Sequence, residues 1–183
     1  MNRLLALGAL CGLFVVGISC KRSEQHVGLA ESQKTAQAVA DIQPTKGNTA
    51  KGTVLFTQEG DKVKVVADIT GLKPNSEHGF HIHEGSEVGE DGMKAGGHYN
   101  PGKHEHGGPQ SAQHHAGDLG NLKADANGNA HLEITLDDIS VNGKQNPIVG
   151  RTVIVHAQPD DYKTQPTGNS GARIAGGVIK LKS

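Results

Sequence analysis

The sequence is poor in cysteine and in aromatic residues, and both shortages narrow what the chain can do. Only two of its 183 residues are cysteines, Cys11 and Cys20, and it has no tryptophan. Because no cysteine follows residue 20, the rest of the chain can form no internal disulfide and contains no CxxC metal motif or thiol nucleophile. Histidine is therefore the residue that is left to supply metal-binding or acid–base chemistry.

An excess of charge of either sign is also absent. The 18 Lys and Arg side chains balance 19 Asp and Glu side chains, which gives a formal net charge of −1 at pH 7. The sequence has no basic block and no basic stretch interleaved with aromatics, so it predicts no nucleic-acid partner. The 26 glycines instead indicate many turns, as is typical of an all-β domain.

The N-terminus predicts export. Arg3 precedes an uncharged apolar run from Leu4 to Ile18, which is shorter than the roughly 20 residues that a membrane-spanning helix needs. A positive residue followed by a short apolar run is typical of a secretory signal peptide. We interpret residues 1–19 as this signal and expect a periplasmic or cell-envelope protein.

The residue after this run predicts an anchor. Cys20 is followed at once by Lys21 and Arg22, and the segment resembles a bacterial lipoprotein processing site. We therefore expect Cys20 to become the lipidated first residue, which would hold the chain at a membrane. The alternative is an ordinary signal peptide cut somewhat later, which would leave a free thiol or a soluble product. Residues 20–45 are polar apart from a weak helical pattern at 29–39, and we interpret them as a tether.

Residues 46–183 predict one all-β domain. Apolar and polar residues alternate over short runs that are bounded by turn signals. Seven such runs are expected to be strands: 51–58, 62–69, 79–84, 120–124, 130–136, 151–157 and 175–181. Two glycine-rich segments, 84–119 and 158–173, do not fit this pattern. Irregular segments of that length in a compact domain are usually functional loops.

Histidines recur on the predicted strands at a spacing that suits a metal. Because residues i and i+2 share a face of a strand, His81 and His83 point to one side and Phe80 points to the other. The same alternation places His156 on the outer face of its strand. Imidazole nitrogen is a good ligand for copper and for zinc. These strands therefore predict a metal site on the outside of a β-barrel.

The first long loop supplies a second set of ligands, His98, His106, His115 and Asp118. Three histidines and one aspartate suit a closed tetrahedral zinc site of the structural kind. His104 and His114 adjoin two of these residues, so either could take the place of its neighbour. The spacing from His98 and from Asp118 favours His106 and His115.

In these residues and their surroundings the chain resembles the copper/zinc superoxide dismutase family. Four segments match that family's signatures in order and spacing: HGFHIHE at 78–84, GGHYNP at 96–101, GDLGN at 117–121 and GNSGAR at 168–173. The resemblance extends over nearly all of residues 46–183. It implies a Greek-key β-barrel or sandwich of about eight antiparallel strands with two long functional loops, and the dismutation of superoxide.

The resemblance also implies a role for each site residue. Copper would be held by His81, His83, His98 and His156, and zinc by His98, His106, His115 and Asp118, with His98 bridging the two ions and exchanging a proton during catalysis. Arg173 would attract the anionic substrate beside copper. Asp160 would accept hydrogen bonds from one histidine of each metal, Thr167 would narrow the channel, and His78 would support the site without binding metal. The family also admits a homodimer.

The chain departs from the family at the loop disulfide. The two cysteine positions correspond to Gly92 and Gly176, so we expect zinc to hold the long loop instead. The 158–173 segment is also shorter than in the animal enzymes, which leaves Lys163 as the candidate for steering the substrate. An alternative function is a copper- or zinc-binding envelope protein without turnover, such as a metal buffer or a metallochaperone-like domain.

Overall fold

The structure, a computed structural model, describes residues 35–183. The expected signal peptide, the lipidated Cys20 and the first part of the expected tether lie outside the described residues. Among residues 35–183, the structure contains no helix that is long and apolar enough to cross a membrane.

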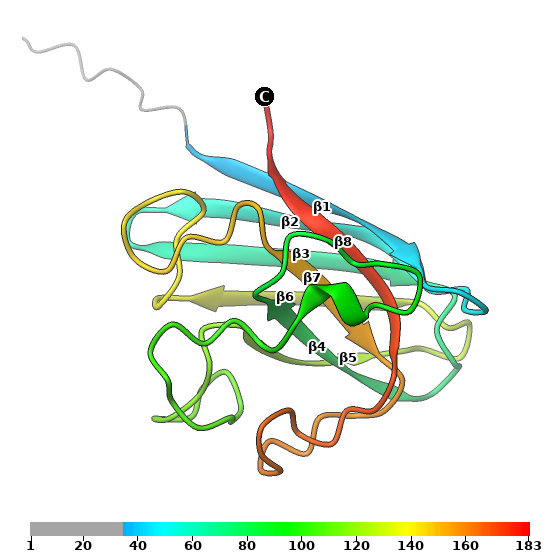
Figure 1. The fold of residues 1–183 in the computed structure, drawn as a ribbon. Helices are drawn as coiled ribbons and strands as arrows, with labels where there is room; N and C mark the ends of the chain where they lie inside the picture. Colours follow the sequence, from blue (N-terminus) through cyan, green and yellow to red (C-terminus); the bar gives the residue numbers. More distant parts are fainter. Residues whose placement is uncertain (1–34) are drawn as a thin grey trace, which may run out of the picture. The chain divides into compact units, whose positions relative to one another are not determined.

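The described part of the chain contains eight antiparallel strands, one short 3-10 helix and the loops that connect them (Figure 1). The all-β fold that the sequence predicts is confirmed. In chain order the elements are β1 (Gln37–Pro44), β2 (Lys51–Glu59), β3 (Lys62–Thr70), β4 (Glu77–His83), η1 (Met93–Ala95), β5 (Asp118–Lys123), β6 (Ala130–Leu136), β7 (Thr152–His156) and β8 (Arg173–Leu181).

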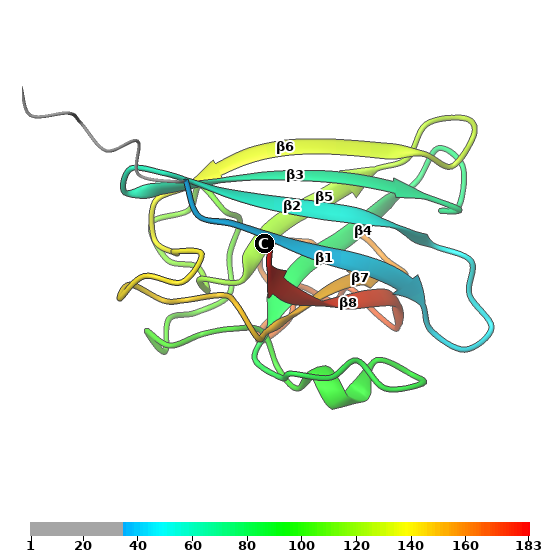
Figure 2. The ribbon, with the colours of Figure 1, turned by 90° about the horizontal axis from the view of Figure 1, so that it is seen from above.

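The strands form a nearly closed barrel. Their order is β5-β4-β7-β8-β1-β2-β3-β6, and each neighbouring pair is antiparallel. The connections from β3 to β4 and from β6 to β7 cross between the two halves of the barrel, whereas β1, β2 and β3 follow one another directly. Seen from above, β6, β3, β2 and β1 lie side by side, with β5, β4 and β7 behind them (Figure 2). This arrangement brings β4 and β7, the two histidine-bearing strands, next to each other.

Alternation of apolar and polar residues builds the core. In β3, Val63, Val65, Ala67 and Ile69 are buried, and the residues between them are more exposed. β2 contributes Val54 and Phe56 in the same way. A strand with one wet face is expected to show this period of two.

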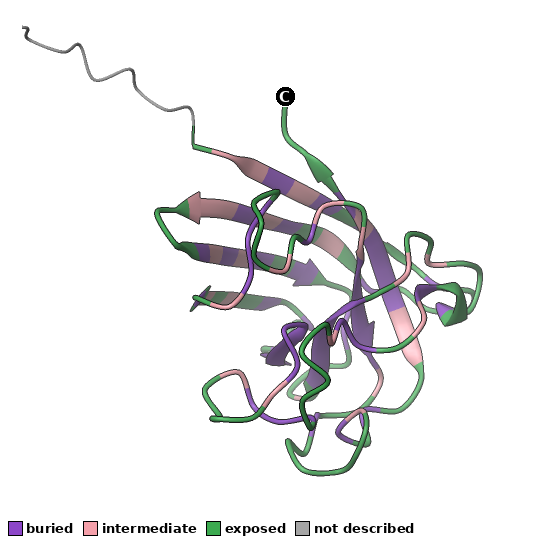
Figure 3. Cartoon of the chain, turned by 60° about the vertical axis from the view of Figure 1, so that its left-hand side comes forward, coloured by how far each residue is buried: buried purple, intermediate pink, exposed green. Residues whose placement is uncertain are grey.

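β4 and β7 differ from this pattern because both of their faces are buried (Figure 3). His81 and His83 are completely inaccessible, as is Ile154 on the same outer side of β7. The sequence predicts imidazoles on the outside of the barrel, and they do lie outside the apolar core. The two long loops fold over them, so the barrel wall and the loops together enclose a polar layer.

The position of β1 shows that the domain begins earlier than the sequence predicts. Residues 37–44 fall in the expected tether, and residues 37–39 in its weak helical pattern, but they form a strand that pairs with β2 on one side and β8 on the other. Ala38, Ala40 and Ile42 are fully buried in the core. Two of these three inward residues are alanines, so the alternation carries little hydrophobic signal. The barrel therefore begins by Gln37 and not at residue 46.

Candidate metal centre

Four histidines from three parts of the chain converge in the first ligand group. His81 and His83 come from β4, His156 from the end of β7 and His98 from the long loop. Their ligand nitrogens all lie within 4.8 Å of one another, and all four residues are buried. The loop residue reaches the strands because the backbone around it pairs with β4: Tyr99 N donates to Ile82 O at 2.8 Å.

The second ligand group consists of His98, His106, His115 and Asp118, also buried and within 4.8 Å of one another. Asp118 starts β5, which pairs with β4, and thus fixes this group beside the first. Its carboxylate is oriented by backbone amides, because His115 N and Gly107 N donate to Oδ2 at 2.8 and 3.2 Å. A compact set of three imidazoles and one carboxylate is a donor set that zinc accepts.

His98 belongs to both groups. Its Nδ1 lies 2.9 Å from Asp118 Oδ1 in the second group. Its Nε2, on the opposite side of the ring, is buried and has no hydrogen-bond partner among the described residues. The ring of His98 packs 4.0 Å from that of His81, centre to centre. One imidazole thus presents a nitrogen to each group, as a bridging ligand requires.

Buried nitrogens without partners test whether metals fit here. His81 Nδ1, His98 Nε2, His106 Nδ1 and His115 Nδ1 are all buried and make no well-directed hydrogen bond within the described part of the chain, although His106 Nδ1 and His115 Nδ1 lie 3.0 and 3.5 Å from the Asp118 carboxylate. An unpaired buried polar atom is costly, so native proteins rarely keep one. Four of them, all pointing into the two ligand groups, are explained if each binds a cation.

His83 and His156 give a further sign of a cation. Each ring directs Nδ1 at a backbone carbonyl, Gly96 O at 3.0 Å and Gly171 O at 3.2 Å. Because Nδ1 donates in both rings, the neutral Nε2 atoms are both acceptors, yet they face each other at 3.3 Å. A metal ion bound by both nitrogens removes this conflict.

Burial keeps the first group ready to bind metal. It lowers the pKa of His98 to about 4 and that of His156 to about 3, and it takes the pKa of His83 well below its ordinary value. These imidazoles are therefore neutral at pH 7, which is the form that coordinates copper or zinc. In the second group burial disfavours the charged carboxylate, but the three imidazoles close to it outweigh this effect and hold the pKa of Asp118 far below its usual range.

Comparison with known proteins agrees with this geometry. Residues 50–179 match the family described as copper/zinc superoxide dismutase (SODC). The chain belongs to the copper/zinc superoxide dismutase family. It is 46% identical over 135 residues to the superoxide dismutase [Cu-Zn] of Paramecium bursaria Chlorella virus 1, an alignment that covers 70% of this chain and 72% of the viral one. Among solved structures it resembles one titled the clock protein EA4, with a TM-score of 0.73 and 38% identity over 81% of this chain and 96% of that one.

In this member of the family, Asp160 connects the two ligand groups from outside. Its Oδ2 accepts a hydrogen bond from His81 Nε2 at 2.7 Å, and its Oδ1 accepts one from His106 Nε2 at 2.9 Å. Metal-bound imidazoles depend on such outer acceptors for their orientation and basicity. The structure thus brings together the contacts that the resemblance implies for this residue.

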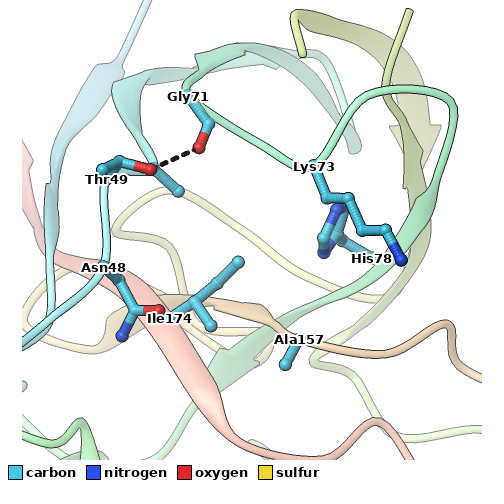
Figure 4. A pocket seen from close by; sticks show the side chains of 8 residues that line it. Asn48, Thr49, Gly71, Lys73, His78, Ala157 and Ile174 are labelled. Atoms are coloured by element: carbon cyan, nitrogen blue, oxygen red, sulfur yellow. Dashed lines mark hydrogen bonds between the residues drawn. The ribbon is translucent and has the colours of Figure 1, made fainter.

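His78 supports the first group without joining it. Its ring nitrogens bond to His156 O and to Ser76 Oγ, both at 2.8 Å. On its other side it lines a pocket together with Lys73, opposite Thr49, whose hydroxyl donates to Gly71 O (Figure 4). No residue of the two ligand groups lines this pocket. His78 therefore lies between the pocket and the first ligand group.

Arg173 lies beside the first group and holds the long loop. It is paired in register with His156 at the start of β8. Its Nη1 donates to Gly92 O at 2.7 Å and its Nη2 donates to Gly96 O at 2.6 Å. Gly96 O also accepts the bond from His83 Nδ1, so one carbonyl connects the guanidinium to a histidine of the first ligand group. This places a fixed positive charge next to the ligands.

The same contacts show how the loop is held without a disulfide. A Cβ atom at Gly92 would come within 2.6 Å of Arg173 Cβ, and this glycine has a φ of +79°, which other residues rarely adopt. Glycine therefore allows the arginine to pack against the loop at the position where the resemblance to the family implies a cysteine. The backbone adds further bonds, among them Glu84 N to Gly97 O at 3.0 Å and Lys46 N to Glu90 O at 2.7 Å.

Other predicted residues take peripheral places. His104 is exposed, and the Nδ1 of His114 donates to the His115 carbonyl, so neither displaces its neighbour from the second group. Thr167 is half-buried in the 158–173 loop, where its carbonyl accepts a bond from Ser170 Oγ at 3.0 Å. Lys163 is exposed in the same loop.

Proposed function

We propose that this chain is an envelope-anchored superoxide dismutase whose copper site is formed by the first ligand group and whose zinc site is formed by the second. The observation that supports this most strongly is the set of buried imidazole nitrogens that make no well-directed hydrogen bond to the described residues and that all point into the two groups. Structural zinc alone would not require the first group, which has four histidines and no carboxylate.

The chain's own residues supply the binding and proton steps. When bound, copper supplies one-electron redox chemistry: one superoxide is oxidised to oxygen, and a second, with two protons, is reduced to hydrogen peroxide. The guanidinium of Arg173 attracts the anion and orients it, since a preorganised positive charge stabilises it better than mobile water does. We expect His98 to hold a proton at Nε2 in one half of the cycle and to pass it to the peroxide.

The second group would keep His98 in place. If the second group holds zinc, the ion would fix the ring and tune the basicity of the opposite nitrogen. Asp118 supplies the negative charge of this site and is itself held by the His115 and Gly107 amides. Because the ligands come from the long loop and from β5, zinc binding would also contribute to the folding free energy of the loop.

Anchoring through Cys20 is proposed from the sequence alone. The lipoprotein-like site predicts that the mature chain begins at this residue and carries a lipid. Intact-mass measurement of the purified mature protein tests it: the expected mass includes acyl chains on an N-terminal Cys20. An unmodified N-terminal peptide would contradict the anchor, and a fractionation that finds the protein outside the envelope would contradict the location.

A homodimer is proposed through a groove between β1, β8 and the start of the long loop. Half-buried Val39, Val88 and Val178 line it, with Glu87 and Lys180 among the charged residues at its rim. A two-fold interface brings the same patch of each copy together, so the three valines of one copy would pack against those of the other. Sedimentation equilibrium is expected to give twice the monomer mass, and Val178→Lys is expected to give the monomer. A wild-type monomer would contradict the proposal.

An assay of superoxide dismutation distinguishes the proposed enzyme from a metal-storage protein without turnover. The metal-loaded chain is expected to dismutate superoxide rapidly, and His156→Ala is expected to lose copper and activity while it keeps zinc. Stoichiometric copper and zinc binding without turnover would favour the storage alternative.

A further inference from the structure

Gln165 makes a contact that the sequence gives no reason to expect. Its side-chain amide meets both backbone groups of one residue, His106, which is 59 positions away in the chain. His106 N donates to Gln165 Oε1 at 2.8 Å, and Gln165 Nε2 donates to His106 O at 2.9 Å. The side-chain amide of Gln165 therefore pairs with His106 as the backbone of a neighbouring β-strand would, with one donated and one accepted hydrogen bond.

The turn before Gln165 presents its amide in this position. The Asp161 carboxylate accepts bonds from Lys163 N at 2.9 Å, Thr164 N at 2.8 Å and Thr164 Oγ1 at 2.6 Å. The turn is closed by Asp161 N to Gly168 O at 2.9 Å and Gly168 N to Thr164 O at 2.6 Å. Because the backbone of this turn is already ordered, only the rotamer entropy of the glutamine side chain is lost when it binds.

His106 is a ligand that needs such support. The five residues before it, 101–105, are exposed, and His106 is the first buried residue as the loop returns to the barrel. Asp160 holds the far side of its ring through Nε2, while Gln165 holds its backbone. Both supports come from the 158–173 loop. The ring can therefore present Nδ1 to the second ligand group in one orientation.

We propose that Gln165 is a positioning residue of the zinc site and that its double hydrogen bond takes over, at this end of the loop, part of the restraint that a disulfide gives in relatives. The proposal rests on the proposed function only in that the second group binds zinc. Outer partners of metal ligands typically contribute roughly 10- to 100-fold to metal affinity. Gln165 is expected to contribute within that range, although it touches no metal.

Zinc affinity of the copper-free full-length chain tests this by competition with a chromophoric chelator. Gln165→Leu removes both hydrogen bonds at similar size and should weaken zinc binding by roughly 10- to 100-fold. Gln165→Glu keeps an acceptor for His106 N and should lose less. The matched control is Gln145→Leu, another exposed glutamine whose amide donates to a backbone carbonyl, Asp137 O, in a different loop.

A spectroscopic measurement separates positioning from a general loss of stability. Cobalt(II) placed in the zinc site reports its ligand geometry through its visible absorption bands, which should shift in Gln165→Leu and stay unchanged in Gln145→Leu. Equal zinc affinity and identical cobalt spectra in the two leucine variants would overturn the proposal. Because these readouts do not involve turnover, a chain that binds zinc but fails to dismutate superoxide contradicts the proposed function and not the role of Gln165.

Discussion

At the scale of single residues, the site is defined by nitrogen atoms that need a cation. The i, i+2 spacing of His81 and His83 predicts two ligands on one face. The structure adds that His81 Nδ1 has no hydrogen-bond partner among the described residues and that His83 Nε2 faces His156 Nε2 at 3.3 Å. His98 is the central residue because each of its two nitrogens faces one group. Alternation along the strands points to His81, His83 and His156. The loop ligands are assigned by counting from His98 and Asp118 and by the resemblance to the family. Neither approach could identify Gln165, because a glutamine in a polar loop has no pattern that distinguishes it.

Substitution of Arg173 tests whether its charge attracts the anionic substrate. Arg173→Lys keeps the positive charge but cannot donate to both Gly92 O and Gly96 O in the same planar geometry, so it should retain part of the rate. Arg173→Glu reverses the charge and should lose roughly 10- to 1000-fold in kcat/KM, the usual range of electrostatic steering. Pulse radiolysis at low and high salt measures both. Equal rates in all three proteins would remove Arg173 from catalysis.

At the scale of elements, β1 and the long loop are the parts that sequence patterns described least well. The strands with valine, isoleucine and phenylalanine at alternate positions were predictable, as β3 illustrates. β1 was not, because Ala38 and Ala40 fit a crowded site in the barrel and give almost no hydrophobic contrast with their polar neighbours. The enclosure of the outer faces of β4 and β7 was also hidden, since it depends on loops that are distant in sequence.

Deletion of β1 tests its place in the barrel. A chain that starts at residue 46 loses the strand between β2 and β8 and leaves both of their edges unpaired. Open edges of that kind promote aggregation, and the loss of three buried side chains removes a sizeable part of a typical stability of about 5–15 kcal/mol. We expect this fragment to be largely unfolded or aggregated by circular dichroism and size-exclusion chromatography, in contrast to a chain that starts at residue 34. Equal melting temperatures would contradict this.

Zinc removal tests how the long loop is held. The described residues contain no disulfide that could restrain this loop, and the second ligand group, Arg173 and Gln165 provide the connections. We expect residues 84–119 to exchange their amide hydrogens faster in the metal-free protein, because metal binding and loop folding are coupled. Exchange in β2 and β3 should stay the same and serves as the internal control. An unchanged loop would mean that hydrogen bonds alone hold it.

At the scale of the whole molecule, the chain builds its site without cysteine. Between residues 35 and 183 the cross-connections are hydrogen bonds, ion pairs, packing and, when bound, metals, with no disulfide among them. With a formal net charge of −1, the molecule has no strong overall field, so attraction of the anion must come from the charge beside the first ligand group.

Because the described fold contains no cysteine, its stability should not depend on the presence of a disulfide reductant. Treatment of the zinc-loaded, copper-free protein with a phosphine reductant should leave its melting temperature unchanged, because the described fold has no disulfide to lose. Loss of a native disulfide typically costs about 2–5 kcal/mol, so a disulfide-bonded relative treated in parallel should melt at a lower temperature. A clear drop for this chain would reveal a stabilising disulfide, such as one between molecules.

Superoxide dismutation by the purified full-length chain, loaded with copper and zinc, tests the central claim most directly when it is measured beside His156→Ala. We predict rapid, copper-dependent turnover for the chain, and loss of turnover with retained zinc binding for the variant. Absence of turnover in a chain that holds both metals in full stoichiometry would contradict the account.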